Sequence, residues 1–289
     1  MNEVTRSMTL PPDSGPAIQI NDQEFNLLRT LVYDNFGINL TEQKRSLVVG
    51  RLHQLLRNQG FKTFREYYDF LVRDKSHANL TELINRISTN YSFFYREKAH
   101  FDFFVKTALP EVVAKLQAKN TNDLRIWTAG CSTGEEPYML AMLMLDFFGN
   151  DYARWSGGIL ATDISDRALS FAHRGLYPED RIKQVPPMLR SRYFIRQGDE
   201  VGVNDRIKKE VTFRRLNLMN PQFPFKKPFH MIFCRNVMIY FDKETRDNLV
   251  RKFHQITEPG GFLFIGHSET LGRDQDLYRY VMPATYQKI

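Results

Sequence analysis

Apolar residues recur every three to four positions through the first part of the chain, which is the spacing of one face of a helix. The segment 22–36 has this period, with Asn21 suited to cap its start and Gly37 suited to end it. The same period recurs in the segments 42–59, 63–74 and 78–88. We therefore predict a small all-helical domain over residues 21–90, after a flexible tail rich in Pro, Ser and Thr over residues 1–20.

The pattern changes beyond this domain. Residues 91–120 are predicted to form a linker, whose long helix covers roughly residues 97–119. Short apolar runs typical of buried strands then alternate with amphipathic segments, and these runs lie at residues 124–129, 157–164, 211–218, 229–237 and 260–267. The alternation predicts an α/β domain with a parallel, doubly wound sheet over residues 121–289. Its ligand is expected outside the carboxyl ends of the strands, where the strand order reverses.

One stretch of this domain departs from the alternation of strands and helices. Between residues 192 and 213, apolar and polar residues alternate around turns that contain Gly and Asn. Such alternation is typical of an antiparallel hairpin. We therefore expect a small antiparallel β-subdomain inserted at about residues 176–212.

Composition narrows the class of protein. The chain has 289 residues; no apolar run approaches the roughly 20 residues of a membrane span, and no signal-peptide pattern opens the sequence, so we expect a soluble, cytoplasmic protein. Cys131 and Cys234 lack metal-binding spacing, which argues against a disulfide framework and against a metal site. The net charge of +7 suggests an acidic partner, which could be nucleic acid, anionic lipid or an acidic protein surface, although it could equally serve solubility alone.

The stretch IWTAGCSTGEEPYML, residues 126–140, joins a predicted strand to a predicted helix through small residues. Gly130 and Gly134 are spaced GxxxG, without the Lys and Ser/Thr of a phosphate-binding loop. Glu135 and Glu136 would repel a pyrophosphate, but a carboxylate can pair with the ammonium of a zwitterionic nucleoside such as S-adenosylmethionine. Both glutamates could instead complement the helix dipole, and the loop alone leaves these interpretations open.

Polar residues at three further strand ends favour the nucleoside. Asp163 follows the strand ILAT, where an acidic side chain can accept hydrogen bonds from both ribose hydroxyls. Asn217 and Asn236 would bring amide groups to the same edge of the sheet, suited to adenine or to the amino-acid part of the ligand. Each residue taken singly could be a turn or cap residue, but together they indicate a site for S-adenosylmethionine.

Four stretches, STNYSFFYRE, TAGCSTGEEPY, ATDIS and IFCRNVMIYF, resemble the CheR-type chemotaxis protein-glutamate O-methyltransferases. The resemblance runs from about residue 22 to the end of the chain. It implies a helical N-terminal domain and a Rossmann-like class I methyltransferase domain with an inserted β-subdomain. It also implies S-adenosyl-L-methionine as methyl donor, S-adenosyl-L-homocysteine as product and chemoreceptor glutamates as acceptors.

The resemblance implies roles for individual residues. With Gly130 of the loop, the residues expected to bind the donor are Asn90, Ser92, Arg96, Gly130, Glu136, Asp163, Asn217, Leu218, Asn236 and Val237. Arg96 and Tyr240 resemble the pair placed near the methyl group in this family, and we expect them to be the catalytic residues. Alternatively, Arg96 pairs with a local acid and Tyr240 is a core aromatic.

Methylation of a glutamate needs little acid–base machinery. A carboxyl group with a pKa near 4.3 is already an anion at neutral pH, so no general base is required. The enzyme has to align oxygen, methyl and sulfur, and to remove part of the water from both charges. Arg96 could orient the acceptor carboxylate, and Tyr240 could shape the methyl pocket or hydrogen-bond the acceptor.

Basic residues near the start of the chain suggest how the substrate is held. Lys44 and Arg51 are seven positions apart and therefore share one face of a predicted helix, with Arg57 nearby. Because the receptors implied by the resemblance present helices that bear glutamates, we expect these three residues to bind the substrate by charge. Each of them could instead belong to a solvated helix face.

Some members of the family bind a receptor tail peptide at the β-subdomain. The tip between residues 196 and 217 is shorter here than in those members, so we expect an enzyme that acts without this tether. RNVMIY stands where many amino-group methyltransferases have (Asp/Asn)-Pro-Pro-(Tyr/Phe), which disfavours a nucleic-acid amine as substrate. Two alternatives stay open: a catalytically silent scaffold that binds the nucleoside, and a nucleic-acid methyltransferase.

Overall fold

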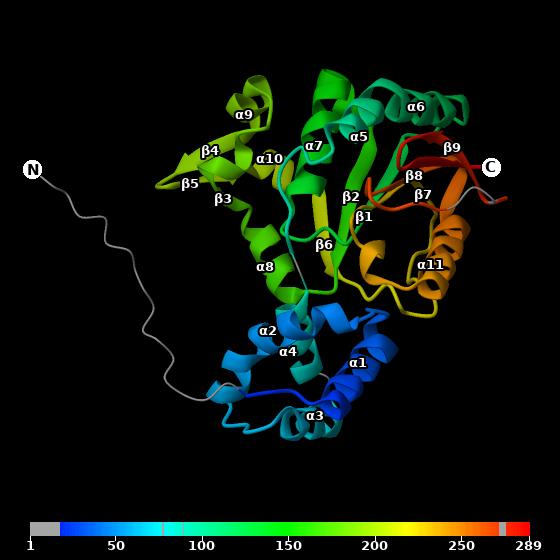
Figure 1. Cartoon of the computed structure of the whole chain (residues 1–289). Coiled ribbons are helices and arrows are strands. Elements are labelled where there is room, and N and C mark those ends of the chain that lie inside the picture. Colours follow the sequence, from blue (N-terminus) through cyan, green and yellow to red (C-terminus); the bar gives the residue numbers. More distant parts are fainter. Residues whose placement is uncertain (1–17, 77, 89, 272–275) are drawn as a thin grey trace, which may run out of the picture.

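The computed structural model describes residues 18–76, 78–88, 90–271 and 276–289, so nearly all of the tail expected over 1–20 lies outside the described residues. The N-terminal part is a bundle of four helices, drawn in blue to cyan in Figure 1. These are α1 (Asp22–Phe36), α2 (Arg45–Asn58, preceded by the short η1, Glu42–Lys44), α3 (Phe64–Arg73) and α4 (Ala78–Ile87). The four helices predicted from the apolar period are therefore confirmed.

Local chemistry explains where the first helix starts and ends. The side chain of Asn21 accepts a hydrogen bond from the backbone of Glu24 (2.9 Å), and the Glu24 side chain accepts one from the backbone of Asn21 (3.0 Å). Gly37 ends the helix with a φ of 68°, a conformation that glycine adopts without strain. The apolar faces of the four helices meet in one core that includes Phe25, Leu52 and Phe64.

Residues 90–97 contain no helix and form the connector between this bundle and the rest of the chain. The helix of the predicted linker starts at Lys98, close to the predicted start near residue 97, because Tyr95 and Glu97 have φ values of 66° and 57°, which interrupt a helix. The helical part consists of α5 (Lys98–Phe103), a π-helical turn η2 (Phe104–Ala108) and α6 (Leu109–Ala118). Within the described residues, every helix is too short or too polar to span a bilayer.

The second domain is built on a seven-stranded sheet. Its spatial order is β6-β2-β1-β7-β8-β10-β9. The strands are β1 (Asp123–Ala129), β2 (Ser156–Asp163), β6 (Val211–Arg215), β7 (Phe229–Cys234), β8 (Thr257–Ile265), β9 (Tyr278–Met282) and β10 (Thr285–Lys288). The five predicted strands are parallel, whereas β10 runs antiparallel to both of its neighbours, so the expectation of an all-parallel sheet is wrong for this C-terminal hairpin.

Alternate residues of the strands pack into two different cores. In β7, Met231 and Phe233 face the core under α5, α6, α7 (Glu135–Phe148) and α8 (Asp166–Arg174), while Ile232 and Cys234 face the core under α11 (Lys243–Gln255). Helices therefore cover both faces of the sheet (Figure 1). Burial on both faces explains why these strands are continuous apolar runs in the sequence.

The predicted antiparallel insertion is present. Three strands, β3 (Leu176–Pro178), β5 (Glu200–Val203) and β4 (Phe194–Gln197), pair in that order. The short helices η4 (Glu179–Ile182), α9 (Pro187–Tyr193) and α10 (Asp205–Lys208) lie between or beside these strands in the chain. Two other short helices lie outside this segment: η3 (Gly149–Arg154) precedes β2, and η5 (Met238–Tyr240) follows β7. In Figure 1 this small sheet projects beside α8, away from the helical domain.

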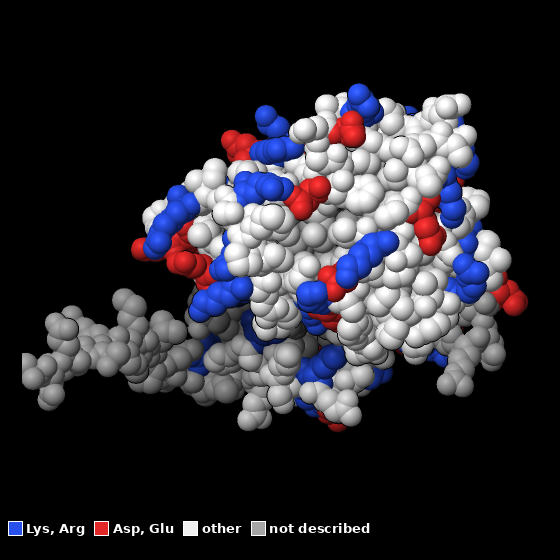
Figure 2. Space-filling view, turned by 90° about the horizontal axis from the view of Figure 1, so that it is seen from above, with Lys and Arg blue, Asp and Glu red and all other residues white. Residues whose placement is uncertain are grey.

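Charge is mixed on one large face of the molecule. Figure 2 shows the face opposite the helical bundle, where Lys and Arg side chains lie singly or beside Asp and Glu. Ion pairs such as Arg192 with Asp146 account for part of this pattern. On that face the basic side chains are therefore spread out among acidic ones.

The helical bundle docks below the sheet at the carboxyl ends of the central strands (Figure 1). The Tyr33 hydroxyl donates to Asp242 (2.7 Å), the Asn217 side chain donates to the backbone oxygen of Asn35 (2.7 Å), and the Asn39 amide donates to the backbone oxygen of Tyr240 (2.8 Å). The bundle thus closes the edge of the sheet at which a ligand is expected.

Replacing Tyr33 with Phe tests the contribution of this docking. The change removes the bond to Asp242 and is expected to lower the free energy of unfolding by about 1 kcal/mol in urea denaturation. Tyr280, exposed on β9, is a matched control, and Tyr280→Phe should leave the stability unchanged. Equal stability of the two variants would show that the Tyr33 contact does not hold the bundle in place.

Candidate active site

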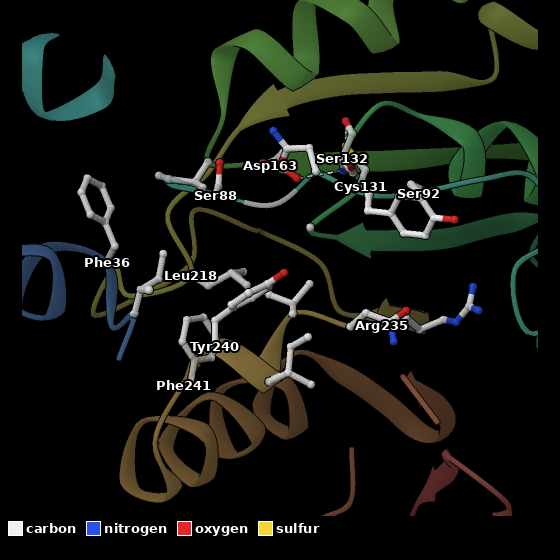
Figure 3. Close-up of a pocket in the computed structure, with 18 of the residues that line it drawn as sticks. Phe36, Ser88, Ser92, Cys131, Ser132, Asp163, Leu218, Arg235, Tyr240 and Phe241 are labelled. Carbon is white, nitrogen blue, oxygen red and sulfur yellow. Dashed lines mark hydrogen bonds between the residues drawn. The ribbon is translucent and has the colours of Figure 1, made fainter. Parts of the chain in front are cut away.

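A cavity of about 360 Å³ lies between the helical bundle and the carboxyl ends of β1, β2 and β7, a volume within the range of small-molecule sites. Figure 3 shows its walls, which come from both domains. All ten predicted donor-binding residues line it, as do two other predicted site residues: Asn90, Ser92, Arg96, Gly130, Glu136, Asp163, Asn217, Leu218, Asn236, Val237, Tyr240 and Lys44. Residues that are far apart in the sequence therefore meet in one place.

The loop after β1 requires glycine for space as well as for backbone conformation. Gly130 has a φ of 87°, and a Cβ atom at this position would lie 2.4 Å from Cγ2 of Val237. Gly134, with a φ of 95°, precedes the first turn of α7. The loop can therefore run close to the wall formed by Val237 and leave room for a ligand.

Asp163 ends β2 inside the cavity. Its carboxylate accepts hydrogen bonds from the backbone amides of Ser132 (2.8 Å) and Ser165 (2.9 Å). Burial raises the pKa of Asp163, although these bonds act in the opposite direction. Two donors leave lone pairs of the carboxylate available, so Asp163 can still accept from hydroxyl groups of a ligand.

The two glutamates of the loop have different surroundings. Glu135 is fully buried, accepts from the Thr133 hydroxyl (2.6 Å), pairs with Arg181 (3.2 Å) and stays out of the cavity wall. Glu136 lines the cavity and is paired with Arg235 (2.6 Å). Burial raises the pKa of Glu136, although the guanidinium of Arg235 lowers it. Of these two glutamates, only Glu136 can therefore offer its carboxylate to a ligand in the cavity.

Arg235 is a site residue that we did not predict. Its side chain is 3% exposed and lies over the ring of Phe101. The guanidinium donates to Glu136, to Glu97 (3.1 Å) and to the backbone oxygen of Arg96. The sequence signal that could have found it is a basic residue directly after the apolar run of β7. A basic residue at such a position is buried only when it has acidic partners. The identity of those partners depends on the tertiary structure.

Glu269 is a second residue that we did not predict. It is buried, and its carboxylate accepts from the backbone amides of Asn236 (3.0 Å), Ile239 (3.0 Å) and Gly266. These bonds hold the turn after β7, in which Asn236 has a φ of 59°. Glu269 therefore fixes the backbone that carries Val237 and the η5 helix.

The side-chain amides of two of the three predicted asparagines, Asn217 and Asn236, are engaged within the protein. Asn217 donates to Asn35, and its oxygen accepts from the Met219 amide (3.0 Å). Asn236 donates to Glu97 (3.3 Å). Both residues line the cavity, and part of the hydrogen-bonding capacity of each amide is used to hold the cavity walls.

The two residues expected to be catalytic, Arg96 and Tyr240, both line the cavity. Arg96 donates to the backbone oxygen of Tyr91 (3.0 Å), and within the described residues no carboxylate is in ion-pair distance of its guanidinium. Figure 3 shows the Tyr240 hydroxyl directed into the cavity. The ammonium of Lys44 lies 5.2 Å from the centre of the Tyr240 ring. The cavity wall therefore carries two cations and a phenol, and of these Lys44 and Tyr240 are neighbours.

The other two residues expected to bind substrate lie outside this cavity. Arg51 donates to the backbone oxygens of Ile87 (2.6 Å) and Ser88 (3.0 Å), and so ties α2 to the end of α4. It also lines a second, more open hollow that contains Arg86, Arg167 and Arg174. Arg57, near the end of α2, lines neither space. The structure thus brings Lys44, but neither Arg51 nor Arg57, to the cavity.

A carboxylate and two imidazoles, those of Glu97, His100 and His267, lie within 4.8 Å of one another. Both oxygens of Glu97 already accept hydrogen bonds, one from Arg235 and the other from Asn236 and the His267 amide. Burial lowers the pKa of His100 to about 4 and so keeps it neutral. The guanidinium of Arg235 thus supplies the positive charge that a metal ion would bring to this group.

In this sheet, carboxylates stand where a dinucleotide-binding protein holds phosphates. This combination is typical of the S-adenosylmethionine-dependent methyltransferases. Two models of one family match consecutive parts of the chain. "CheR methyltransferase, all-alpha domain" matches residues 23–88, and "CheR methyltransferase, SAM binding domain" matches residues 90–287. The chain belongs to the CheR methyltransferase family, and its cofactor is S-adenosylmethionine.

Known relatives are similar over almost their whole length. The chain is 46% identical over 272 residues to the chemotaxis protein methyltransferase of Borreliella burgdorferi, which covers 94% of this chain and 96% of the relative. It is 35% identical over 256 residues to the chemotaxis protein methyltransferase of Escherichia coli, with 87% and 86% covered. The glycopeptide N-methyltransferase MtfA with bound donor is far more distant, at 15% identity and a TM-score of 0.29 over 49% of this chain and 46% of that one.

Gly130→Ala tests whether this loop forms the donor site. The added Cβ would collide with Val237 and disfavour the positive φ, so we expect binding of S-adenosylhomocysteine, measured by calorimetry, to weaken at least tenfold. A Cβ atom added at Gly50 in α2 would have no atom within 4 Å. The Gly50→Ala variant should therefore bind S-adenosylhomocysteine normally and be slightly more stable. Normal binding by a folded Gly130→Ala protein would place the donor elsewhere.

Proposed function

We propose that this enzyme transfers the methyl group of S-adenosylmethionine to glutamate side chains of chemoreceptors. The products are glutamate methyl esters and S-adenosylhomocysteine. The observation that carries the proposal is the presence of two cationic side chains, Arg96 and Lys44, in the wall of the donor cavity, which also contains Tyr240 next to Lys44. The relatives of Borreliella burgdorferi and Escherichia coli are named chemotaxis protein methyltransferases, which supports the same biological role.

The donor has one orientation that matches the charges of the cavity. Glu136 would pair with the ammonium of its methionine part, and Asp163 would accept from the ribose hydroxyls. Gly130 leaves room for the chain between these two ends. The sulfonium methyl would then face the wall that carries Arg96 and Tyr240.

A carboxylate acceptor needs no proton removed, and it would be attracted to Arg96 and Lys44. The S–CH₃ bond breaks as the O–CH₃ bond forms, and the electron pair of the broken bond stays on sulfur. A cation and an anion thereby become two neutral groups, so a site with little water favours the reaction. Apolar side chains of the cavity wall, including Ile38, Leu218 and Val237, support this.

The receptor surface would be an acidic helix that approaches from the side of α2. Lys44 would meet the carboxylate that enters the cavity. Arg51 and Arg57 would extend the positive charge along α2, and Arg51 also fixes α2 against α4. The proposal needs no receptor tail peptide at the β-subdomain.

Incubation with donor carrying a labelled methyl group tests the acceptor. Receptor cytoplasmic fragments and RNA would be supplied in parallel reactions. Label on the receptor that is released by mild base, as a methyl ester requires, is the expected result. Label on RNA would instead indicate a nucleic-acid methyltransferase, and binding of the donor without any transfer would indicate a silent scaffold.

Arg96→Ala tests the catalytic wall. We expect methyl transfer to the receptor fragment to fall about 100-fold, because a misplaced acceptor loses alignment with the methyl group. The matched control is Arg154→Ala, since Arg154 is exposed on η3 and remote from the cavity. Unchanged turnover in Arg96→Ala, with the fold confirmed by circular dichroism, would exclude the role assigned to Arg96.

A further inference from the structure

One buried guanidinium lies between two carboxylates from distant parts of the chain. Arg235 donates to Glu136 at 2.6 Å and to Glu97 at 3.1 Å. Glu136 lines the donor cavity, whereas Glu97 stands behind it, at the end of the connector. Two negative charges therefore share one positive charge, which leaves a net charge of −1 in this group.

This balance matters because Glu136 already has a cationic partner. A carboxylate paired with one arginine alone has little charge left for the ammonium of a donor. If a second carboxylate engages the same arginine, the group keeps one negative charge, and the donor ammonium can neutralise it. The guanidinium of Arg96 also attracts Glu136 at longer range, and this further positive charge makes the second carboxylate more necessary.

Glu97 is held firmly enough to engage Arg235. One of its oxygens accepts from the Asn236 side chain (3.3 Å) and from the His267 amide (3.3 Å), while the other accepts from Arg235. Although burial acts to raise the pKa of Glu97, Arg235 and these donors hold it below its ordinary value. Glu97 also keeps a φ of 57°, a costly conformation that these contacts maintain.

We propose that Glu97 is a positioning residue of the donor site, which engages Arg235 so that Glu136 stays available for the ammonium of the donor. Glu97 does not touch the donor and acts only through Arg235. The inference rests on the proposed pairing of Glu136 with the donor ammonium. It goes beyond that pairing by assigning a role to a side chain outside the cavity.

Glu97→Gln tests this with two ligands of different charge. S-adenosylhomocysteine contains the amino-acid part, whereas 5′-methylthioadenosine contains the same nucleoside and thioether without it. In Glu97→Gln, Arg235 would pair with Glu136 alone, so the Kd for S-adenosylhomocysteine should rise about tenfold. The Kd for 5′-methylthioadenosine should stay within about twofold of the wild type. Calorimetry on the full chain measures both.

Two further variants complete the experiment. Glu97→Asp keeps the charge and should retain more affinity for S-adenosylhomocysteine than Glu97→Gln. Glu258→Gln makes the same chemical change in a different arginine pair, with Arg125 at 2.9 Å, and should bind both ligands normally. An equal loss for both ligands in Glu97→Gln, or no loss for either, would overturn the inference. Failure of the wild type to bind S-adenosylhomocysteine would instead refute the proposed donor site.

Discussion

The arrangement of the active site depends on the burial of one positive charge. The guanidinium of Arg235 is almost inaccessible to water, and an uncompensated charge in such a place costs several kcal/mol. It is compensated only because β7, the connector and the first turn of α7 meet at this point and bring Glu97, the Arg96 carbonyl and Glu136 to it. The requirement to compensate the charge of Arg235 thus holds together the three segments that meet at the Glu136 side of the cavity.

Backbone strain is concentrated around the same cavity. Among the described residues, non-glycine residues with positive φ include Tyr95 and Glu97 in the connector, Ser132 in the glycine loop and Asn236 after β7. Such conformations persist where surrounding contacts determine them, and here the contacts are hydrogen bonds to buried carboxylates, namely Asp163, Glu97 and Glu269. The cavity is therefore shaped before a ligand enters, which reduces the ordering that binding would otherwise require.

The helical bundle has a physical reason to lie where it does. The carboxyl ends of parallel strands form an open edge, and a reaction between a sulfonium and a carboxylate is favoured when water is kept away from both. The bundle supplies Phe36, Ile38 and Leu40 to one side of the cavity and Lys44 to another. Both domains of the CheR family are thus needed to enclose the site.

Most of the fold was determined by local patterns in the sequence, because helix and strand periods, caps and turns each depend on a few neighbouring residues. The four helices of the bundle and the five parallel strands follow from such patterns, and so does the glycine loop with Asp163 at the next strand end. The connector and the β9–β10 hairpin were not predictable in this way. The Arg96 carbonyl and the Glu97 side chain are held by contacts with residues more than 130 positions away.

The site divides along the same line. Residue types and spacing were sufficient to predict a nucleoside site lined by carboxylates. The reason is that a glycine loop after one strand and an acidic residue at the end of the next strand together suit a nucleoside ligand. Which side chains face the cavity was decided only by the tertiary structure. It turns Glu136 inward and Glu135 away, directs the Asn217 amide to Asn35, and places Arg235 in the cavity wall and Glu269 behind it. The physical reason is that charge compensation and hydrogen-bond satisfaction of buried groups depend on partners that only folding brings together.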